Sequence, residues 1–72
     1  MTNSQMLENK IKESGYLKQW ILDQMGIKSY ETLRAKIRNK RDFTASEIDK
    51  LCDILSLTKS QREAIFFAKS AE

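Results

Sequence analysis

Hydrophobic residues recur three or four positions apart along most of the chain, the spacing that places them on one face of an α-helix. This pattern predicts five helical segments separated by short breaks. We therefore expect an all-α fold of five short helices. The apolar stripes of the segments are, in chain order, Leu7 and Ile11; Leu17, Trp20, Ile21 and Met25; Tyr30, Leu33 and Ile37; Ile48, Leu51, Cys52 and Leu55; and Ile65 and Ala68.

The expected ends of the first three helices carry residues that suit a left-handed backbone conformation. Gly15 follows the first segment, and Gly26 follows the second. The third segment, from about residue 29 to residue 38, has Ser29 as its N-cap. Asn39 comes directly after it and is the next-best residue to glycine for such a turn. These residues predict where each helix stops.

The last two helices have clear start signals. Residues 44–47 (TASE) form a capping box, in which the threonine hydroxyl accepts from the glutamate amide and the glutamate carboxylate accepts from the threonine amide. Phe43 and Ile48 occupy the two positions of a hydrophobic staple around it. Residues 58–61 (TKSQ) form a second capping box, which is expected to open a helix that continues to about Lys69.

Length and composition bound the class of protein. A chain of 72 residues, 40% hydrophobic and 32% charged, is expected to form one globular domain over residues 1–72. Its N-terminus lacks a signal-peptide pattern, and its longest apolar run, residues 64–68, is too short to cross a membrane. Cys52 is the only cysteine, so no internal disulfide is expected. We therefore expect a cytoplasmic protein with no membrane contact.

The chain contains no histidine. This absence removes the usual general base, the Ser–His and Cys–His nucleophile pairs and the commonest zinc ligand. A glycine-rich phosphate-binding loop is missing as well. We therefore expect that the protein is not an enzyme and that it has no metal site and no cofactor.

Positive charge is concentrated in one stretch of the chain. Residues 28–41 contain six basic residues and one acidic residue, a net charge of +5, whereas the whole protein carries only +3. A solvated helix face is the ordinary explanation of a charge run, but this imbalance favours a polyanion or an acidic partner. The stretch falls on the third expected helix and on the loop after it.

The second and third segments, residues 17–38, have the form of a helix-turn-helix motif. In that motif the glycine of the turn adopts a positive φ, and apolar residues on both helices fix their crossing so that the second helix can enter a DNA groove. Any helical hairpin with a glycine turn shows a similar pattern. The residues expected to fix the crossing here are Ile21, Met25, Ile27, Leu33 and Ile37.

Residues 7–69 resemble the Cro/repressor-type helix-turn-helix proteins of temperate phages of Gram-positive hosts. The most specific segments are residues 39–48 (NKRDFTASEI), 51–55 (LCDIL) and 65–69 (IFFAK). The resemblance implies a lambda-repressor-like fold of five helices and a role at a lysis/lysogeny switch. In size and sequence the chain is also similar to modulator-of-repression proteins, which act with or against a phage repressor.

The chain departs from that family around the turn. Leu22 stands where the family usually has alanine, and Leu33 comes seven residues after the turn glycine instead of the usual six. By the resemblance, Tyr30, Glu31 and Ala35 hold the positions that usually face DNA bases. None of the three is a side chain that pairs well with a base edge in this setting, whereas tyrosine and alanine suit a protein interface.

Two functions of different class remain open. In the first, which the poor base-reading positions favour, the protein is an antirepressor that binds the phage repressor. In the alternative it is a Cro-type repressor, acting as a homodimer, that binds operator DNA directly. A regulator encoded by the host would use the same chemistry. The expected DNA or partner contacts are Lys18, Gln19, Lys28, Ser29, Tyr30, Glu31, Arg34, Ala35, Arg38, Lys40 and Arg41, with Lys36 as a further phosphate contact in the DNA-binding alternative.

A few other residues have specific expectations. Trp20 is expected in the core between the first two helices and not as an exposed stacking platform. Cys52 is expected to be a buried structural thiol and not a redox sensor. Phe66 and Phe67 are adjacent, and a helix buries a stripe only about 100° wide, so one of them is expected to point away from the stripe. That residue either folds over a small core or belongs to a dimer or partner patch.

Overall fold

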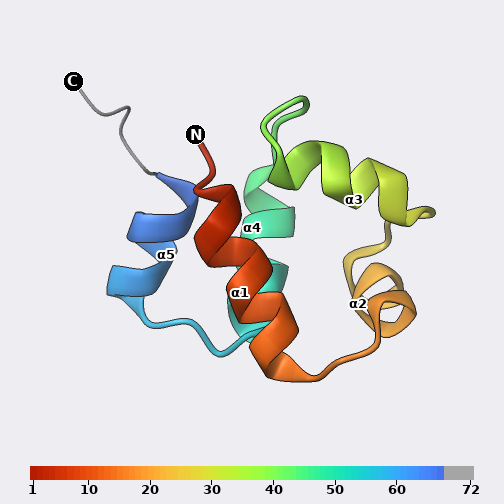
Figure 1. Cartoon of the computed structure of the whole chain (residues 1–72), viewed down its shortest axis with the longest axis horizontal. Helices are drawn as coiled ribbons and strands as arrows, with labels where there is room; N and C mark the ends of the chain where they lie inside the picture. Colours follow the sequence, from red (N-terminus) through yellow and green to blue (C-terminus); the bar gives the residue numbers. More distant parts are fainter. Residues whose placement is uncertain (68–72) are drawn as a thin grey trace.

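Five helices account for most of residues 1–67, the part of the chain that the computed structural model describes. They are α1 (Ser4–Ser14), α2 (Lys18–Met25), α3 (Tyr30–Ile37), α4 (Ala45–Ile54) and α5 (Lys59–Phe66). Helix α1 packs against α3 and α5, and α2 packs against α3 and α4 (Figure 1). No strand occurs within residues 1–67, which confirms the expected all-α fold of five short helices.

The predicted ends of the first three helices are confirmed. Gly15, Gly26 and Asn39 have φ angles of 71°, 72° and 66°, all in the left-handed region. Between α2 and α3, the Ile27 amide donates to the Leu22 carbonyl at 3.0 Å. That bond satisfies a carbonyl that the end of α2 would otherwise leave free, and it turns the chain toward α3.

The predicted helix starts are confirmed as well. The Ser29 hydroxyl accepts from the Thr32 amide at 3.3 Å, and the capping boxes headed by Thr44 and Thr58 have both of their reciprocal hydrogen bonds. Helix α5 ends earlier than expected, because Phe67 already has a non-helical φ of −121°. Residues 68 and 69, to which we expected this helix to extend, lie outside the described residues.

One hydrophobic cluster joins all five helices. The five residues expected to fix the crossing of α2 and α3 all belong to it, so that prediction is confirmed. Cys52, expected to be buried, is only half-buried against the cluster. The buried members are Leu7, Ile21, Leu22, Met25, Ile27, Leu33, Ile37, Leu51, Ile65 and Phe66.

The predicted buried face of α2 is wrong in two positions. Leu17 is 77% exposed and Trp20 is 42% exposed, although both were expected to be buried. Helix α2 packs between α3 and α4, so its buried side is formed by Ile21, Leu22 and Met25. Trp20 precedes Ile21 by one residue, which turns it by about 100° out of that contact. The rotation of α2 therefore places Trp20 at the surface.

The N-terminal segment closes the ends of two helices, which we did not anticipate. The Asn39 side chain donates to the Thr2 carbonyl and accepts from the Thr2 amide, each at 2.8 Å. The Ser4 hydroxyl donates to the Ile37 carbonyl at 2.6 Å, at the end of α3. The Asn3 amide donates to the carbonyl of Ile65 in α5. The segment thereby satisfies carbonyl groups near the ends of α3 and α5.

The two adjacent phenylalanines point in different directions, as expected. Phe66 is 4% exposed, and its ring meets that of Phe43 edge-on, with centroids 5.5 Å apart. Phe67 is 55% exposed. Phe67 is therefore the one that points away from the stripe, and of the two candidates for a dimer or partner patch only Phe67 is exposed.

This difference in exposure predicts that truncating the two phenylalanines lowers the free energy of unfolding by different amounts. Phe66→Ala removes a buried ring and should lower the free energy of unfolding by about 3–5 kcal/mol. Phe67→Ala is the matched control and should change it by less than about 1 kcal/mol, because its ring remains largely in water. Urea unfolding followed by circular dichroism measures both. Equal losses for the two variants would contradict this assignment of core and surface.

Candidate functional site

The surface formed by α2, the turn after it, α3 and the next loop holds every contact residue that we predicted. Nine of these eleven residues are exposed, and only Tyr30 and Ala35 are half-buried. In Figure 1 the two helices lie together on the side of the molecule opposite α5. The structure thus brings the predicted residues to one accessible side, although they do not all have the same surroundings.

The basic residues near the end of α3 are held there by the backbone. The amides of Lys40 and Arg41 both donate to the Ala35 carbonyl, at 2.9 and 3.3 Å, so the chain folds back against the last turn of α3. Cations are favourable at this end because the helix dipole is negative there. Arg34 and Arg38 are exposed in the same region. We call Lys28, Arg34, Arg38, Lys40 and Arg41 the basic arc.

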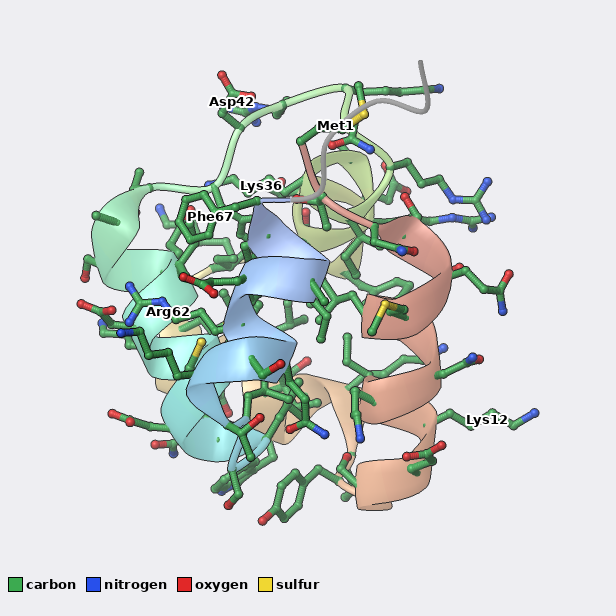
Figure 2. The ribbon with its side chains drawn as sticks, turned by 90° about the vertical axis from the view of Figure 1, so that its left-hand side faces the viewer. Met1, Lys12, Lys36, Asp42, Arg62 and Phe67 are labelled. Atoms are coloured by element: carbon green, nitrogen blue, oxygen red, sulfur yellow. The ribbon has the colours of Figure 1, made fainter. Side chains whose placement is uncertain are left out.

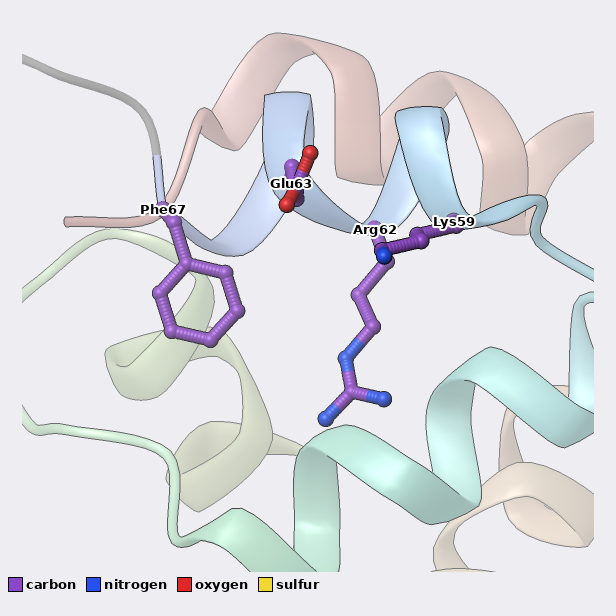
Figure 3. A pocket seen from close by; sticks show the side chains of 4 residues that line it. All are labelled: Lys59, Arg62, Glu63 and Phe67. Atoms are coloured by element: carbon purple, nitrogen blue, oxygen red, sulfur yellow. The ribbon is translucent and has the colours of Figure 1, made fainter.

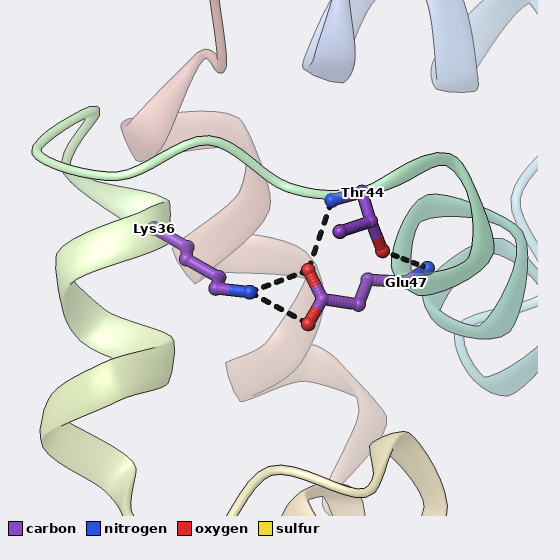
Figure 4. A network of polar contacts seen from close by, with 3 residues as sticks. All are labelled: Lys36, Thr44 and Glu47. Carbon is purple, nitrogen blue, oxygen red and sulfur yellow. Dashed lines mark hydrogen bonds and ion pairs between the residues drawn. The ribbon is translucent and has the colours of Figure 1, made fainter.

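Lys36 does not belong to the basic arc, which corrects its assignment as a phosphate contact. Its residue is only 8% exposed, and its ammonium group donates to both carboxylate oxygens of Glu47 at 2.6 Å (Figure 4). In the sequence, Lys36 is one of the six basic residues of the stretch 28–41 and has nothing to distinguish it from the others. The fold instead turns Lys36 toward α4, where it joins α3 to the start of that helix.

Glu47 serves two interactions at once. Its carboxylate binds Lys36 and also accepts from the Thr44 amide at 2.9 Å, while the Thr44 hydroxyl accepts from the Glu47 amide at 3.2 Å. Burial by itself raises the pKa of Glu47, but the hydrogen bonds and charge of Lys36, together with the bonds of Thr44, outweigh burial and lower the pKa below its ordinary value of 4.5. Glu47 is therefore a charged partner that links the capping box to α3.

Tyr30 and Arg38 are less free than the sequence indicated. Tyr30 packs against the core, and the Lys18 ammonium lies 4.5 Å from the centre of its ring, a cation–π contact. Arg38 approaches the carboxylate of Glu8 at 3.9 Å, a long and mostly exposed ion pair. Tyr30 is therefore part of a packed wall at the start of α3, and Arg38 stays accessible.

An exposed apolar patch lies at the start of α2, and we did not predict it. Leu17 is the N-cap of α2 but makes no side-chain capping bond. Beside it, the rings of Tyr16 and Trp20 are in contact, with their centroids 4.7 Å apart and their planes tilted by 39°, and Tyr16 is 45% exposed. The sequence signal was leucine at a position that favours Ser, Thr, Asp or Asn. We call Tyr16, Leu17 and Trp20 the apolar patch.

A groove of about 430 Å³ adjoins the apolar patch between α1, the start of α2 and α3. Tyr16 belongs to both the patch and the groove. Gly15 contributes backbone at the turn where α1 ends. The groove is lined by Glu8, Ile11, Lys12, Gly15, Tyr16, Lys18, Tyr30 and Ile37.

A second hollow, of about 610 Å³, lies away from this side, between α4 and α5. Phe67 stands at one end of it, and Arg62 reaches toward α4 (Figure 3), where its guanidinium binds Asp49 at 2.9 Å. Lys59 and Glu63 complete the lining. In Figure 2 Phe67 lies near the loop that carries Asp42.

Comparison with known proteins gives no relative from which to transfer a role: no family model, curated protein or solved structure matches the chain. Within the described residues, no cluster of His, Cys, Asp and Glu could hold a metal ion. Residues 1–67 also contain no helix with the length and apolar character needed to span a membrane. The function must therefore be inferred from the chemistry of this surface.

The buried ion pair predicts energetic coupling between α3 and α4. Lys36→Met and Glu47→Gln should each destabilise the protein, because either change leaves a partly desolvated group without its charged partner. The double variant should lose less than the sum, with a coupling of about 1–3 kcal/mol measured by chemical denaturation. Lys40→Met, at an exposed lysine, is the control and should have little effect. Strictly additive losses would contradict the pairing.

The lowered pKa of Glu47 predicts a pH dependence of stability. The ion pair should stabilise the protein fully above the ordinary pKa of 4.5, and this contribution should be lost as pH falls from there through the lower pKa of the folded state. Glu47→Gln lacks that proton-binding site. The difference in unfolding free energy between the wild type and this variant should therefore shrink below about pH 4.5. A constant difference down to acid pH would contradict the assignment.

Proposed function

We propose that this protein is a helix-turn-helix antirepressor of a phage lysis/lysogeny switch, which binds the phage repressor through the surface around the start of α2. Residues 17–38 form the helix-turn-helix. The buried contacts between α2 and α3, the positive φ of Gly26 and the Ser29 cap are all consistent with that motif. The bound repressor is switched off or redirected because its contact with the operator is altered.

The observation that carries the proposal is the apolar patch. In helix-turn-helix proteins that bind DNA, the first helix of the motif crosses the phosphate backbone. Here that position is occupied by Leu17, which is 77% exposed, with the paired rings of Tyr16 and Trp20 beside it. Apolar side chains gain little beside hydrated phosphates. Tyrosine and tryptophan, by contrast, are enriched among the residues that contribute most to protein interfaces.

The base-reading positions add to this preference. Tyr30 packs on the core beneath Lys18, and Ala35 is half-buried. Glu31 is exposed and carries a negative charge that DNA phosphates would repel. A partner protein can complement such a mixed surface, because its own charged and apolar groups can be arranged to match.

Direct binding to operator DNA is the second candidate, and the basic arc favours it. All five of its residues are exposed, and four of them gather at the end of α3 and the following loop. Contacts of this kind with phosphates bind without sequence preference and weaken steeply with salt. The arc therefore supports affinity for DNA, and its arginines are side chains of the type that most often pairs with guanine.

Leu17→Ser separates the two candidates. Serine is a preferred N-cap, so this variant should keep or raise the stability of the protein, by up to about 1 kcal/mol. If the repressor is the target, loss of the exposed leucine should weaken the complex about tenfold or more, which corresponds to about 1.4 kcal/mol. Isothermal titration calorimetry with the purified repressor of the same phage measures the affinity, and urea unfolding measures the stability.

The matched variant for DNA is Lys40→Gln combined with Arg41→Gln. If operator DNA is the target, this double variant should weaken binding to all sequences and reduce the salt slope by about two, as followed by fluorescence anisotropy. Leu17→Ser should then bind DNA like the wild type. Tight operator binding by the wild type, with no repressor complex formed, would overturn the antirepressor proposal.

A further inference from the structure

The groove beside the apolar patch is lined by both apolar and positively charged side chains. Its apolar lining comprises Ile11, the buried Ile37 and the rings of Tyr16 and Tyr30. Lysines 12 and 18 line the same groove. An apolar interior with a cationic edge suits an apolar side chain that is followed closely by a negatively charged group.

The two lysines at this edge have no acidic partner within residues 1–67, although Glu8 also lines the groove and Lys18 lies over the Tyr30 ring. Of the acidic residues on α1, Glu8 faces Arg38 at 3.9 Å and Glu13 faces Lys10 at 3.8 Å. Within residues 1–67, neither Lys12 nor Lys18 forms an ion pair. In Figure 2 the Lys12 side chain extends from α1 away from the body of the molecule. The edge of the groove is therefore complementary to a carboxylate.

We infer that the groove receives one helix of the phage repressor, which places an apolar side chain against Ile11, Tyr16 and Tyr30 and a carboxylate, one helical turn away, against Lys12 and Lys18. This inference rests on the proposed function and specifies the partner surface. A helix meets the requirement because residues three or four positions apart lie on the same face. Continuity through Tyr16 lets the same partner cover the apolar patch.

Two other occupants of the groove, a DNA strand and a second copy of this chain, fit its surface less well. A DNA strand would satisfy the two lysines but would leave the apolar interior without a complementary group. A second copy of this chain would need its own exposed aromatic residue beside a carboxylate, and Phe67 with Glu63 is such a pair. That contact joins two different surfaces, so it would build rings or open chains of molecules instead of a closed two-fold dimer.

Lys12→Glu tests the inference without touching the apolar patch. Lys12 is exposed and belongs to neither the core nor an ion pair, so the variant should fold normally by circular dichroism. It should bind the purified repressor about tenfold more weakly, with the affinity of the wild type falling more steeply with salt. Lys59→Glu, an equal charge reversal on α5, is the control and should bind like the wild type.

Charge exchange then identifies the partner helix. One Asp→Lys or Glu→Lys variant of the repressor should restore binding to Lys12→Glu, and alanine at an apolar residue three or four positions from that site should weaken binding to the wild type. If Lys12→Glu binds the repressor normally while Leu17→Ser does not, the groove inference is wrong but the antirepressor function stands. If the wild type binds no repressor, the proposed function itself fails.

Two further results would overturn the inference in favour of another occupant. Concentration-dependent self-association of the wild type, measured by analytical ultracentrifugation and abolished by both Lys12→Glu and Phe67→Ala, would assign the groove to a second copy of this chain. Loss of operator DNA binding by Lys12→Glu, with repressor binding unchanged, would assign its edge to phosphate groups.

Discussion

The ion pair between Lys36 and Glu47 is the contact on which the functional surface depends. It joins the last turn of α3 to the N-terminus of α4 and shares its carboxylate with the Thr44 capping box. Because Lys36 is turned inward beside Leu33, the opposite side of α3 is the side that faces solvent. The pair thus sets the rotation of α3 about its axis. Two charged side chains fix this rotation in a protein whose hydrophobic core is small.

The N-terminal segment complements this pair at the same end of α3. Asn39 holds a left-handed turn and binds Thr2 through both ends of its side-chain amide. The chain can therefore reverse after α3 while its polar groups stay paired. As a consequence, the cations of the following loop are kept beside α3, apart from the apolar patch at the start of α2. One side of the molecule thereby offers two chemically different surfaces.

The separation of these surfaces explains why two functions are compatible with one motif. The basic arc resembles a surface for phosphates, whereas the apolar patch and its groove resemble a surface for a protein. Fixed positive charge beside apolar side chains also restricts which proteins can bind, since a partner must bring carboxylates as well as apolar groups. Under the proposed function, specificity for a single repressor would come from the combination, which neither surface provides alone.

The helices and most of their limits could be predicted from the sequence because they depend on local interactions; the end of α5 was the exception. Caps such as Thr44 and left-handed residues such as Gly26 act within a few positions of themselves. Which side of a helix is covered depends instead on neighbours distant in sequence, so the exposure of Trp20 and the inward turn of Lys36 were predicted wrongly. The eleven expected contact residues lie on α2, α3 and the segments that follow them, as their sequence positions imply, but the apolar patch and the groove arise only where α1, α2 and α3 meet. Local propensity determined the elements of this protein, and packing between them decided its surface.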